Sequence, residues 1–215
     1  MITHEDQLNL FKIIAKEIKE DIECYAFGGT AMMFYGFKGE TKDIDLFFDT
    51  LKSRAAFIAA ISKIGFQETS ALKIYIPEKL REKHRPLMFK REDYRFDLFS
   101  VKIFHTVISP RMKEDLFAVH EFKDKHTLKL KVLRTEHIVQ LKAVTERDKD
   151  FEDILAIVKK DKNFSWQYLV DEALWQHEHG DSWAIIDVER VMKELKEYVF
   201  IEKKYFEQLY NGKKQ

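Results

Sequence analysis

The sequence is poor in the residues that build disulfide frameworks, rigid linkers and membrane spans. Its 215 residues include one cysteine, three prolines and seven glycines. A single cysteine excludes an internal disulfide framework and any zinc site built on cysteines. No apolar run approaches the roughly 18 residues that a membrane-spanning helix needs. The first ten residues, MITHEDQLNL, carry early acidic side chains and no long apolar run. We therefore expect no signal peptide and a soluble, cytoplasmic protein.

Net charge of either sign is also missing. Lys+Arg and Asp+Glu are both 37, so the formal net charge is zero. This balance argues against a globally basic nucleic-acid-binding protein, but it leaves room for a local basic groove. A hydrophobic content of 45% and an aromatic content of 13% are sufficient for a sizeable core. The length suits one large domain or a domain with an appendage.

The few glycines are concentrated in one stretch, residues 25–49, which reads YAFGGTAMMFYGFKGETKDIDLFFD. Its apolar start predicts a buried strand over residues 24–27, in which Cys24 is a packed thiol. A turn at Gly28-Gly29 would end this strand and let the backbone approach a ligand closely. Thr30 is the expected N-cap of a short buried helix over residues 31–37, and a second strand follows.

Two aspartates, Asp43 and Asp45, lie in this second strand with one residue between them. On a strand both carboxylates project from one face, roughly 6–7 Å apart, while Ile44 and Leu46 point into the core. Like charges on one face repel, and a divalent cation between them would compensate for this cost. Oxygen ligands of this kind suit Mg²⁺. The alternative, which is more frequent for such a short motif alone, is a strand end whose carboxylates pair with lysines in solvent.

The combination of G-G-T with T-x-D-I-D-L about a dozen residues later resembles the signature of the polymerase-β-like nucleotidyltransferase superfamily. The residues of this stretch are most similar to those of the small bacterial and archaeal branch related to AbiEii-type toxins. That family uses a third carboxylate on a neighbouring strand, and Asp97 lies in the alternating segment 94–99 that suits this role. The resemblance covers residues 25–49 well, 94–99 moderately and 133–153 more weakly.

The resemblance implies an α/β (α+β) fold, with a mixed twisted sheet of the nucleotidyltransferase type flanked by helices and an all-helical C-terminal part. We expect the nucleotidyltransferase core over residues 1–134 and the helical part over residues 135–215, where the hydrophobic pattern becomes helical throughout. Further strands are predicted over residues 66–76, 87–89, 94–101 and 127–133, the last at the edge of the sheet because its lysines would prevent pairing. Helices are predicted over residues 4–20, 51–64, from Ser109-Pro110 through 119, 135–145, 148–160, 166–176 and 183–209.

For function, the resemblance implies Mg²⁺-dependent transfer of a nucleoside monophosphate from an NTP to a hydroxyl acceptor, with release of pyrophosphate. The predicted catalytic residues are also the predicted ligands of two Mg²⁺ ions, with Mn²⁺ as the alternative metal: Asp43, Asp45 and Asp97. The predicted nucleotide contacts are Gly28, Gly29, Thr30, Lys42 and Lys142.

Basic residues suggest where phosphates would lie. Lys142 is surrounded by apolar residues on its predicted helix, so it either contacts phosphate or snorkels to the surface. An interhelical ion-pair network is expected from Arg147, Lys149, Asp150 and Asp153. The charged connection over residues 79–95 is predicted either as a solvated hairpin loop or as a basic lip that contacts the triphosphate or an RNA acceptor such as a tRNA end.

Two other functions are consistent with the same residues. One is a non-catalytic module that binds a nucleotide or a cognate antitoxin-like protein, and this would be favoured if Asp97 faced away from the Asp43–Asp45 pair. The other is a metal-dependent phosphoesterase. The segment His177–Asp181 looks metal-binding, but it lacks the H-E-x-x-H spacing and is predicted to be a solvated helix end.

Overall fold

The computed structural model describes residues 1–70, 83–145 and 147–213 of the chain. The chain divides into two compact units. Unit 1 consists of Met1–His105 and Lys113–Leu133, and unit 2 consists of Thr106–Met112 and Arg134–Gln215. The expected fold class is confirmed, because a mixed sheet with flanking helices is followed by a helical C-terminal part. In the described ranges, the helices lack the length and apolar character needed to cross a bilayer.

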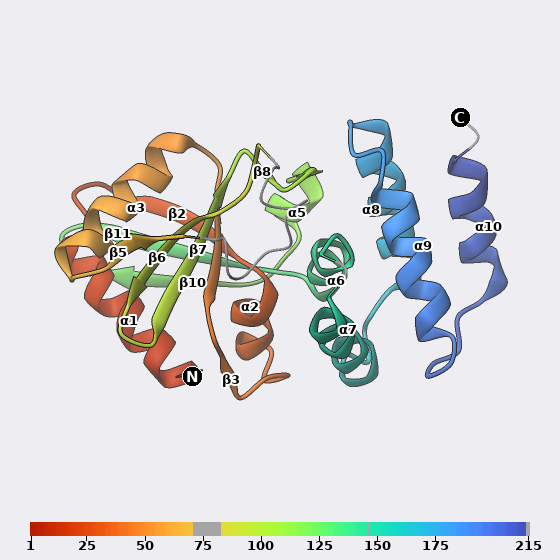
Figure 1. The fold of residues 1–215 in the computed structure, drawn as a ribbon, viewed down its shortest axis with the longest axis horizontal. Coiled ribbons are helices and arrows are strands. Elements are labelled where there is room, and N and C mark those ends of the chain that lie inside the picture. Colours follow the sequence, from red (N-terminus) through yellow and green to blue (C-terminus); the bar gives the residue numbers. More distant parts are fainter. Residues whose placement is uncertain (71–82, 146, 214–215) are drawn as a thin grey trace. The chain divides into compact units, whose positions relative to one another are not determined.

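Unit 1 is built on a mixed sheet (Figure 1). The order of its strands is β10 (Leu116–Lys123), β11 (Thr127–Leu133), β2 (Ile22–Ala26), β4 (Ile44–Phe48), β7 (Tyr94–Ser100), β6 (Leu87–Arg91) and β5 (Gln67–Thr69). The β11–β2 and β4–β7 pairs are parallel, and the other neighbours are antiparallel. A short strand β8 (Lys102–Ile103) pairs with β7, while β1 (Ile2–Thr3) and β3 (Glu40–Thr41) form a separate ribbon.

Strand β4, in the centre of the sheet, is apolar because it is buried on both faces. Four residues of β4 are at most 1% exposed, namely Ile44, Leu46, Phe47 and Phe48. Helix α3 (Leu51–Lys63) places Phe57 against Phe48 and Phe96, with ring centroids 5.2 and 5.5 Å apart. Such a strand reads as a continuous apolar run, so the single polar residue within it stands out. That residue is Asp45.

Helix α1 (His4–Glu17) begins as its sequence predicts. The hydroxyl of Thr3 accepts the N–H of Asp6 at 3.2 Å, and the Asp6 carboxylate accepts the N–H of Thr3 at 3.0 Å. This capping box satisfies two backbone donors that a helix start leaves without partners. The predicted packed thiol is also confirmed, because Cys24 is fully buried and its burial raises the pKa of the thiol.

Residues 116–119 were predicted to continue the helix that begins at Ser109-Pro110, and this is wrong. Helix α5 (Pro110–Glu114) does start there, with the Ser109 hydroxyl accepting the N–H of Met112 at 3.1 Å. It ends at Glu114, and the following residues form β10, whose side chains alternate between exposed and partly covered positions.

Strand β10 takes the edge of the sheet, so the prediction that residues 127–133 form an edge strand is also wrong. Strand β11 pairs on both sides, with β10 and with β2. Its lysines are compatible with this position because Glu23 on β2 accepts Lys129 at 2.9 Å and Lys131 at 2.5 Å. The two lysines therefore form charged cross-strand pairs with Glu23 and do not protect an edge of the sheet.

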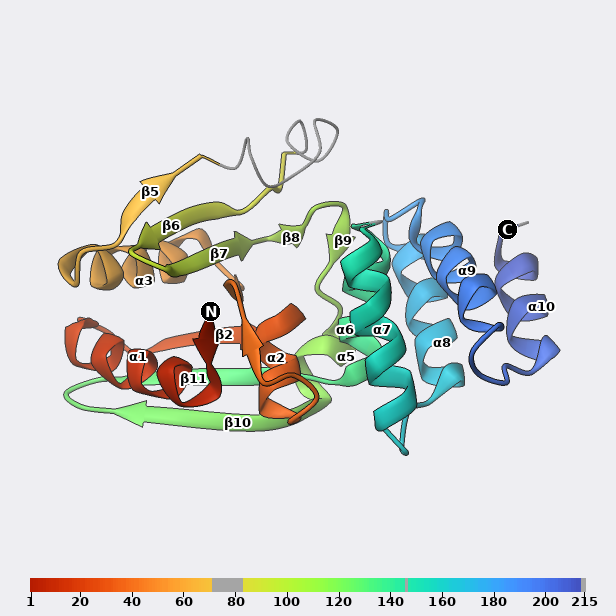
Figure 2. The same cartoon turned by 60° about the horizontal axis from the view of Figure 1, so that its bottom comes forward.

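In its described residues, unit 2 is helical apart from β9 (Thr106–Val107) (Figure 2). Its helices are α6 (Thr135–Ala143), α7 (Asp148–Lys160), α8 (Trp166–Glu178), α9 (Ala184–Leu195) and α10 (Lys203–Gly212). The predicted single helix over residues 183–209 is wrong, because residues 196–202 separate α9 from α10. A continuous helix of that length would extend about 40 Å. The break instead returns Leu209 to the interior, where it is fully buried.

Two smaller predictions concern chain segments at element ends. The strand predicted over residues 66–76 is present as β5, and residues 71–76 lie outside the described part of the chain. The segment from His177 to Asp181 lies at the end of α8, where Glu178 and His179 are exposed and Gly180 has a φ of +98°. The prediction of a solvated helix end is confirmed for residues 178–180 and wrong for Asp181, which is fully buried and accepts the Thr106 hydroxyl at 3.0 Å.

Candidate functional site

Asp45 and Asp97 lie side by side on neighbouring strands. Strands β4 and β7 run parallel and pair these two residues directly in register. Register partners project from the same face of a sheet, so both carboxylates leave the sheet on one side. Asp43 lies two residues before Asp45, one position before β4 begins. The register therefore gathers three acids at the start of β4.

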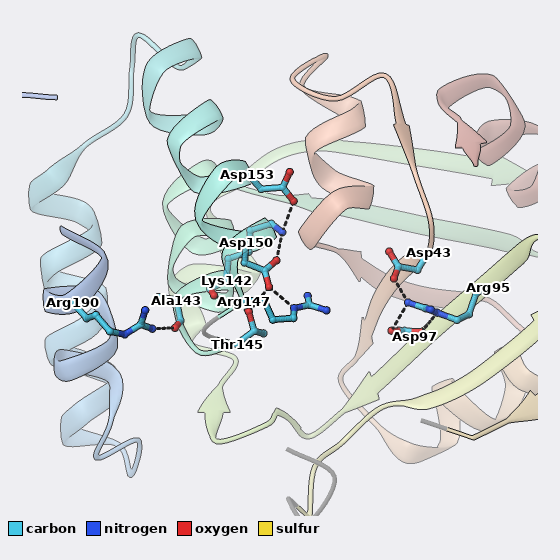
Figure 3. A network of polar contacts seen from close by, with 10 residues as sticks. All are labelled: Asp43, Arg95, Asp97, Lys142, Ala143, Thr145, Arg147, Asp150, Asp153 and Arg190. Carbon is cyan, nitrogen blue, oxygen red and sulfur yellow. Dashed lines mark hydrogen bonds and ion pairs between the residues drawn. The ribbon is translucent and has the colours of Figure 1, made fainter. Parts of the chain in front are cut away.

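The guanidinium group of Arg95 lies between Asp43 and Asp97 (Figure 3). Its Nε donates to Asp97 Oδ1 at 2.9 Å, and one Nη donates to Asp43 Oδ2 and, at 3.4 Å, to Asp97 Oδ2. Arg95 precedes Asp97 by two residues on β7, so the two side chains share a face. One planar cation thus joins Asp43 to Asp97, which are 54 residues apart in the sequence.

Burial makes this pairing necessary. Asp97 is 1% exposed, and the side chains of Arg95 and Asp43 are 16% and 23% exposed. A buried carboxylate without a partner would cost several kcal/mol or take up a proton. Burial alone would lower the pKa of Arg95, but the carboxylates of Asp97, Asp43 and Asp45 raise it above its ordinary value. The pairing thus gives Asp43 and Asp97 a shared cationic partner within unit 1.

The predicted glycine turn forms one wall of the cluster. Gly28 has a φ of +56°, which favours glycine, and a Cβ at this position would lie 2.4 Å from Asp45 Oδ2. A Cβ on Gly29 would lie 2.6 Å from Thr41 Oγ1, and that hydroxyl donates to Asp43 Oδ1 at 3.4 Å. The absence of side chains therefore lets the backbone of the first turn of α2 (Gly28–Phe34) lie against the Asp45 carboxylate and against the Thr41 hydroxyl that bonds to Asp43.

The prediction that Thr30 is the N-cap of the helix is wrong, and its contact with a nucleotide stays a prediction. Helix α2 begins at Gly28, so Thr30 lies inside it, and the N-cap position is Phe27 without a side-chain bond. The fully buried Thr30 hydroxyl accepts the N–H of Asp45 at 2.8 Å, while the N–H of Phe27 donates to the Asp45 carbonyl at 3.4 Å. These bonds fix the backbone of Asp45, because a buried amide needs a partner.

The two lysines predicted to contact the nucleotide occupy contrasting environments. Lys42 is exposed on the connection between β3 and β4. Lys142 is buried on α6 in unit 2, where its ammonium donates to Asp150 Oδ1 at 2.7 Å and Asp153 Oδ2 at 2.8 Å. The expectation that Lys142 could snorkel to the surface is therefore wrong. Its contact with a phosphate stays a prediction.

The ion-pair network expected around Lys142 is present. Arg147 Nε donates to Asp150 Oδ2 at 2.6 Å, and the Thr145 hydroxyl donates to the same carboxylate (Figure 3). Burial would raise the pKa of Asp150, but Lys142 and Arg147 lower it to about 2. Lys149, which was expected to join the network, is exposed.

The basic stretch over residues 79–95 is described from residue 83 onward. Lys83, Arg85 and Lys90 are exposed, as a basic lip requires. Arg91 instead donates to the carbonyl of Ile64 at 2.7 Å, and Arg95 belongs to the acidic cluster. Arg91 and Arg95 therefore pair with acceptors inside unit 1 and do not belong to an exposed basic lip.

The fit of the acidic cluster to a metal ion depends on its donor atoms and on their arrangement. In the described residues, no group of three or more His, Cys, Asp or Glu side chains is arranged so that it could hold a metal. Within the cluster, Arg95 contacts Asp43 and Asp97, while the Asp45 carboxylate lies against Gly28. The donor set itself suits Mg²⁺, because it consists of carboxylate oxygens. Binding of a metal by these three acids stays a prediction.

Arg95 is the residue that sequence reasoning placed in the wrong group. It was counted with the basic connection, although it forms R-x-D with Asp97 on a predicted strand. The same two-residue periodicity that joined Asp43 to Asp45 would have placed Arg95 and Asp97 on one face.

Comparisons with known proteins found solved structures that are similar to this chain. No family model matches the chain, and no curated protein matches it. ANT(2")-Ia, solved in complex with adenylyl-2"-tobramycin, is 12% identical with a TM-score of 0.38, over 87% of this chain and 98% of that chain. JHP933 from Helicobacter pylori is 15% identical with a TM-score of 0.42, over 100% of this chain and 94% of that chain.

A second H. pylori structure, provisionally described as a nucleotidyltransferase, is 16% identical with a TM-score of 0.42, over 98% of this chain and 94% of that chain. Sequence identities and TM-scores this low do not show a function. The function is therefore inferred from the residues of this chain.

Replacing Gly28 should reveal its contact with Asp45. Gly28→Ala introduces a left-handed alanine and forces the Asp45 carboxylate aside, so we expect the free energy of unfolding to fall by about 2 kcal/mol. Gly36→Ala is the matched control, because Gly36 has a φ of +71° and nothing lies within 4 Å of its Cβ. It should cost about 1 kcal/mol. Equal losses in urea unfolding would contradict the proposed close contact.

Replacing Lys142 should destabilise the protein in a pH-dependent way. Lys142→Gln removes the ammonium that joins the buried Asp150 carboxylate to the partly exposed Asp153 carboxylate, so we expect a loss of about 3 kcal/mol at pH 7. The pKa of Asp150 lies below its ordinary 3.8, at about 2. Its stabilising contribution is therefore complete above the ordinary value and disappears as the pH falls toward about 2.

The difference between Lys142→Gln and the wild type in urea unfolding should accordingly narrow at acidic pH. Lys149→Gln removes an equal charge from an exposed neighbour and should change stability by at most about 0.5 kcal/mol. A difference that stays constant down to acidic pH would rule out Asp150 as the partner responsible.

Proposed function

We propose that the protein is a Mg²⁺-dependent nucleotidyltransferase. It would move a nucleoside monophosphate from an NTP to a hydroxyl acceptor and release pyrophosphate. The observation that carries the proposal is the meeting of Asp45 and Asp97 in register on two parallel strands, with Asp43 joined to Asp97 through Arg95. Three acids at one strand end, bordered by a glycine turn, form the kind of arrangement that metal-dependent phosphoryl chemistry uses.

The acids and the glycine turn have separate roles in this proposal. Asp43, Asp45 and Asp97 would hold Mg²⁺, or Mn²⁺ in its place, and the metal would neutralise charge on the reacting phosphate. Asp43 and Asp45 are partly exposed, so they can reach a ligand. Asp97 is buried and would act as the anchored member of the set. The backbone at Gly28 and Gly29 would lie closest to the triphosphate.

Basic side chains would complete nucleotide binding. Exposed Lys42 lies one residue before Asp43 and would contact the phosphates directly. Lys142 is retained as a proposed phosphate contact, for which one of its pairs with Asp150 or Asp153 would have to open. The exposed Lys83, Arg85 and Lys90 belong to the stretch 79–95 that would bind an RNA acceptor such as a tRNA end in the cytoplasm.

A specific observation favours a second candidate function. The pairing of Arg95 with Asp43 and Asp97 gives two of the three acids a cation from the chain itself. A non-catalytic module, which binds a nucleotide or an antitoxin-like partner protein, would be served by such a pre-formed polar network. A nucleotidyltransferase would convert its NTP to products, whereas the binding module would bind its ligand without converting it.

Amide variants of the acids should separate the candidates. We would incubate the protein with each labelled NTP, Mg²⁺ and total RNA, and measure label transfer and pyrophosphate. Asp45→Asn and Asp97→Asn should each lower transfer at least about a hundredfold, because each removes a charged metal ligand. Asp49→Asn is the control: Asp49 follows β4, accepts the Tyr25 hydroxyl at 3.1 Å and pairs with Lys113 at 2.6 Å.

The control variant should keep transfer within about twofold of wild type, since its carboxylate lies outside the Arg95 cluster. Full activity of Asp45→Asn would show that the site is wrong. Nucleotide binding without transfer to any RNA would favour the binding module. Release of product without pyrophosphate would indicate a phosphoesterase.

A further inference from the structure

Helices α9 and α10 of unit 2 lie side by side (Figure 2), and a groove of about 600 Å³ runs between them. At one end, a Cβ on Gly212, the last residue of α10, would lie 3.4 Å from the side chain of Ile185 near the start of α9. At the other end, the ammonium of Lys196, just after α9, lies 5.0 Å from the ring centroid of Phe206 in α10. The two helices are therefore antiparallel, and the groove belongs to unit 2 alone.

Three lysines line the end of the groove where α9 ends and α10 begins: Lys193, Lys196 and Lys203. Lys193 pairs with Glu189 and Lys203 pairs with Glu207, both at 2.8 Å and both one turn apart on one helix. The side chains of these two lysines are 63% and 89% exposed, and ion pairs in such positions contribute little to stability. In the described part of the chain, no acidic side chain pairs with Lys196. An anion can therefore reach all three ammonium groups without breaking a buried ion pair.

Two aromatic rings continue the groove beyond these lysines. Phe206 and Tyr210 are four residues apart on α10, so they lie on the same face of the helix. The core side of α10 is occupied by Leu209, which is fully buried, whereas Tyr210 is 56% exposed and Phe206 is partly exposed. Exposed rings beside a row of basic side chains provide the stacking surfaces and the phosphate contacts with which proteins bind single-stranded nucleic acid.

The composition of the lining favours a nucleic-acid strand over an acidic helix of a partner protein. A docked helix inserts its apolar face into a hydrophobic groove. Among the described residues that line this groove, the side chains are charged, aromatic or amide, and aliphatic hydrophobic residues are missing. A strand of nucleic acid needs no aliphatic anchor, because its phosphates bind lysines and its bases stack on rings.

We propose that the α9–α10 groove binds single-stranded RNA, with phosphates on Lys193, Lys196 and Lys203 and bases stacked on Phe206 and Tyr210. This inference deepens the proposed function, on which the choice of RNA as the nucleic acid rests. The groove is a contact for the acceptor in addition to the stretch 79–95. Since the formal net charge of the chain is zero, the affinity depends on these local side chains and not on the overall field of the protein.

The test measures binding of fluorescently labelled oligouridylate by anisotropy, without Mg²⁺ or NTP and at several salt concentrations. Lys196→Gln should weaken binding about fivefold and lower the slope of log affinity against log salt by about one, because one phosphate contact is lost. Lys204→Gln is the matched control, since Lys204 pairs with Glu202 and does not line the groove. Its affinity should stay within about twofold of wild type.

Replacement of an aromatic residue separates stacking from charge. Tyr210→Ala should weaken binding about tenfold and leave the salt dependence unchanged, because a stacking surface is lost without a phosphate contact. Phe200→Ala is the matched control, since Phe200 is 86% exposed and lies outside the groove lining. It should bind RNA as wild type does. All four variants change exposed residues, so thermal unfolding should show each of them folded and melting close to wild type.

Three results would overturn the proposal: no oligouridylate binding by the wild type, unchanged binding by Lys196→Gln and Tyr210→Ala, or equal losses in the two controls. Labelled polyglutamate tests the acidic protein as the occupant. It should bind more weakly than oligouridylate, because it offers no bases to stack. If polyglutamate binds more tightly than RNA and loses affinity in Lys196→Gln and Tyr210→Ala, the groove accepts an acidic protein and the RNA assignment is wrong.

Failure of the proposed function looks different from failure of this inference. If RNA binding responds to the variants as expected but no nucleoside monophosphate is transferred, the transferase assignment alone fails. If transfer to RNA occurs while Lys196→Gln and Tyr210→Ala bind RNA as wild type does, the groove assignment alone fails.

Discussion

The in-register parallel pairing of β4 with β7 is the constraint on which the candidate site depends. Side chains alternate along a strand, so a slip of one residue would turn Asp97 to the opposite face and bring an apolar residue beside Asp45. The register is set by buried apolar pairs, with Ile44 opposite Phe96 and Leu46 opposite Leu98. The hydrophobic core thus positions the acids, although the acids themselves repel one another.

Contacts from α2 then hold the acid-bearing strand at its start. Thr30 and Phe27 use both backbone polar groups of Asp45, and Gly28 packs directly against its carboxylate. The short helix is buried over residues 28–33, so this contact cannot relax into solvent. The glycine turn consequently has a packing role as well as its proposed role beside the triphosphate. Its two functions require the same property, which is the absence of a side chain.

The sequence predicted the features that depend on short-range periodicity. Helices α1, α3 and α7 and the strand carrying Asp45 follow from apolar spacing. The failures have tertiary causes. Strand β10 is visible only through its pairing with β11, and the break between α9 and α10 reflects the burial of Leu209. Arg95 was missed because its charge was assigned to a loop before its strand position was considered.

Two carboxylate clusters in this chain are each held together by basic side chains. Lys142 and Arg147 match Asp150 and Asp153, and removal of a cation there leaves a buried charge that the fold must tolerate. Arg95 bridges Asp43 and Asp97, so acids from two neighbouring parts of the sheet share one cation of the chain itself. This bridge reinforces by charge the same β4–β7 pairing that the apolar register sets.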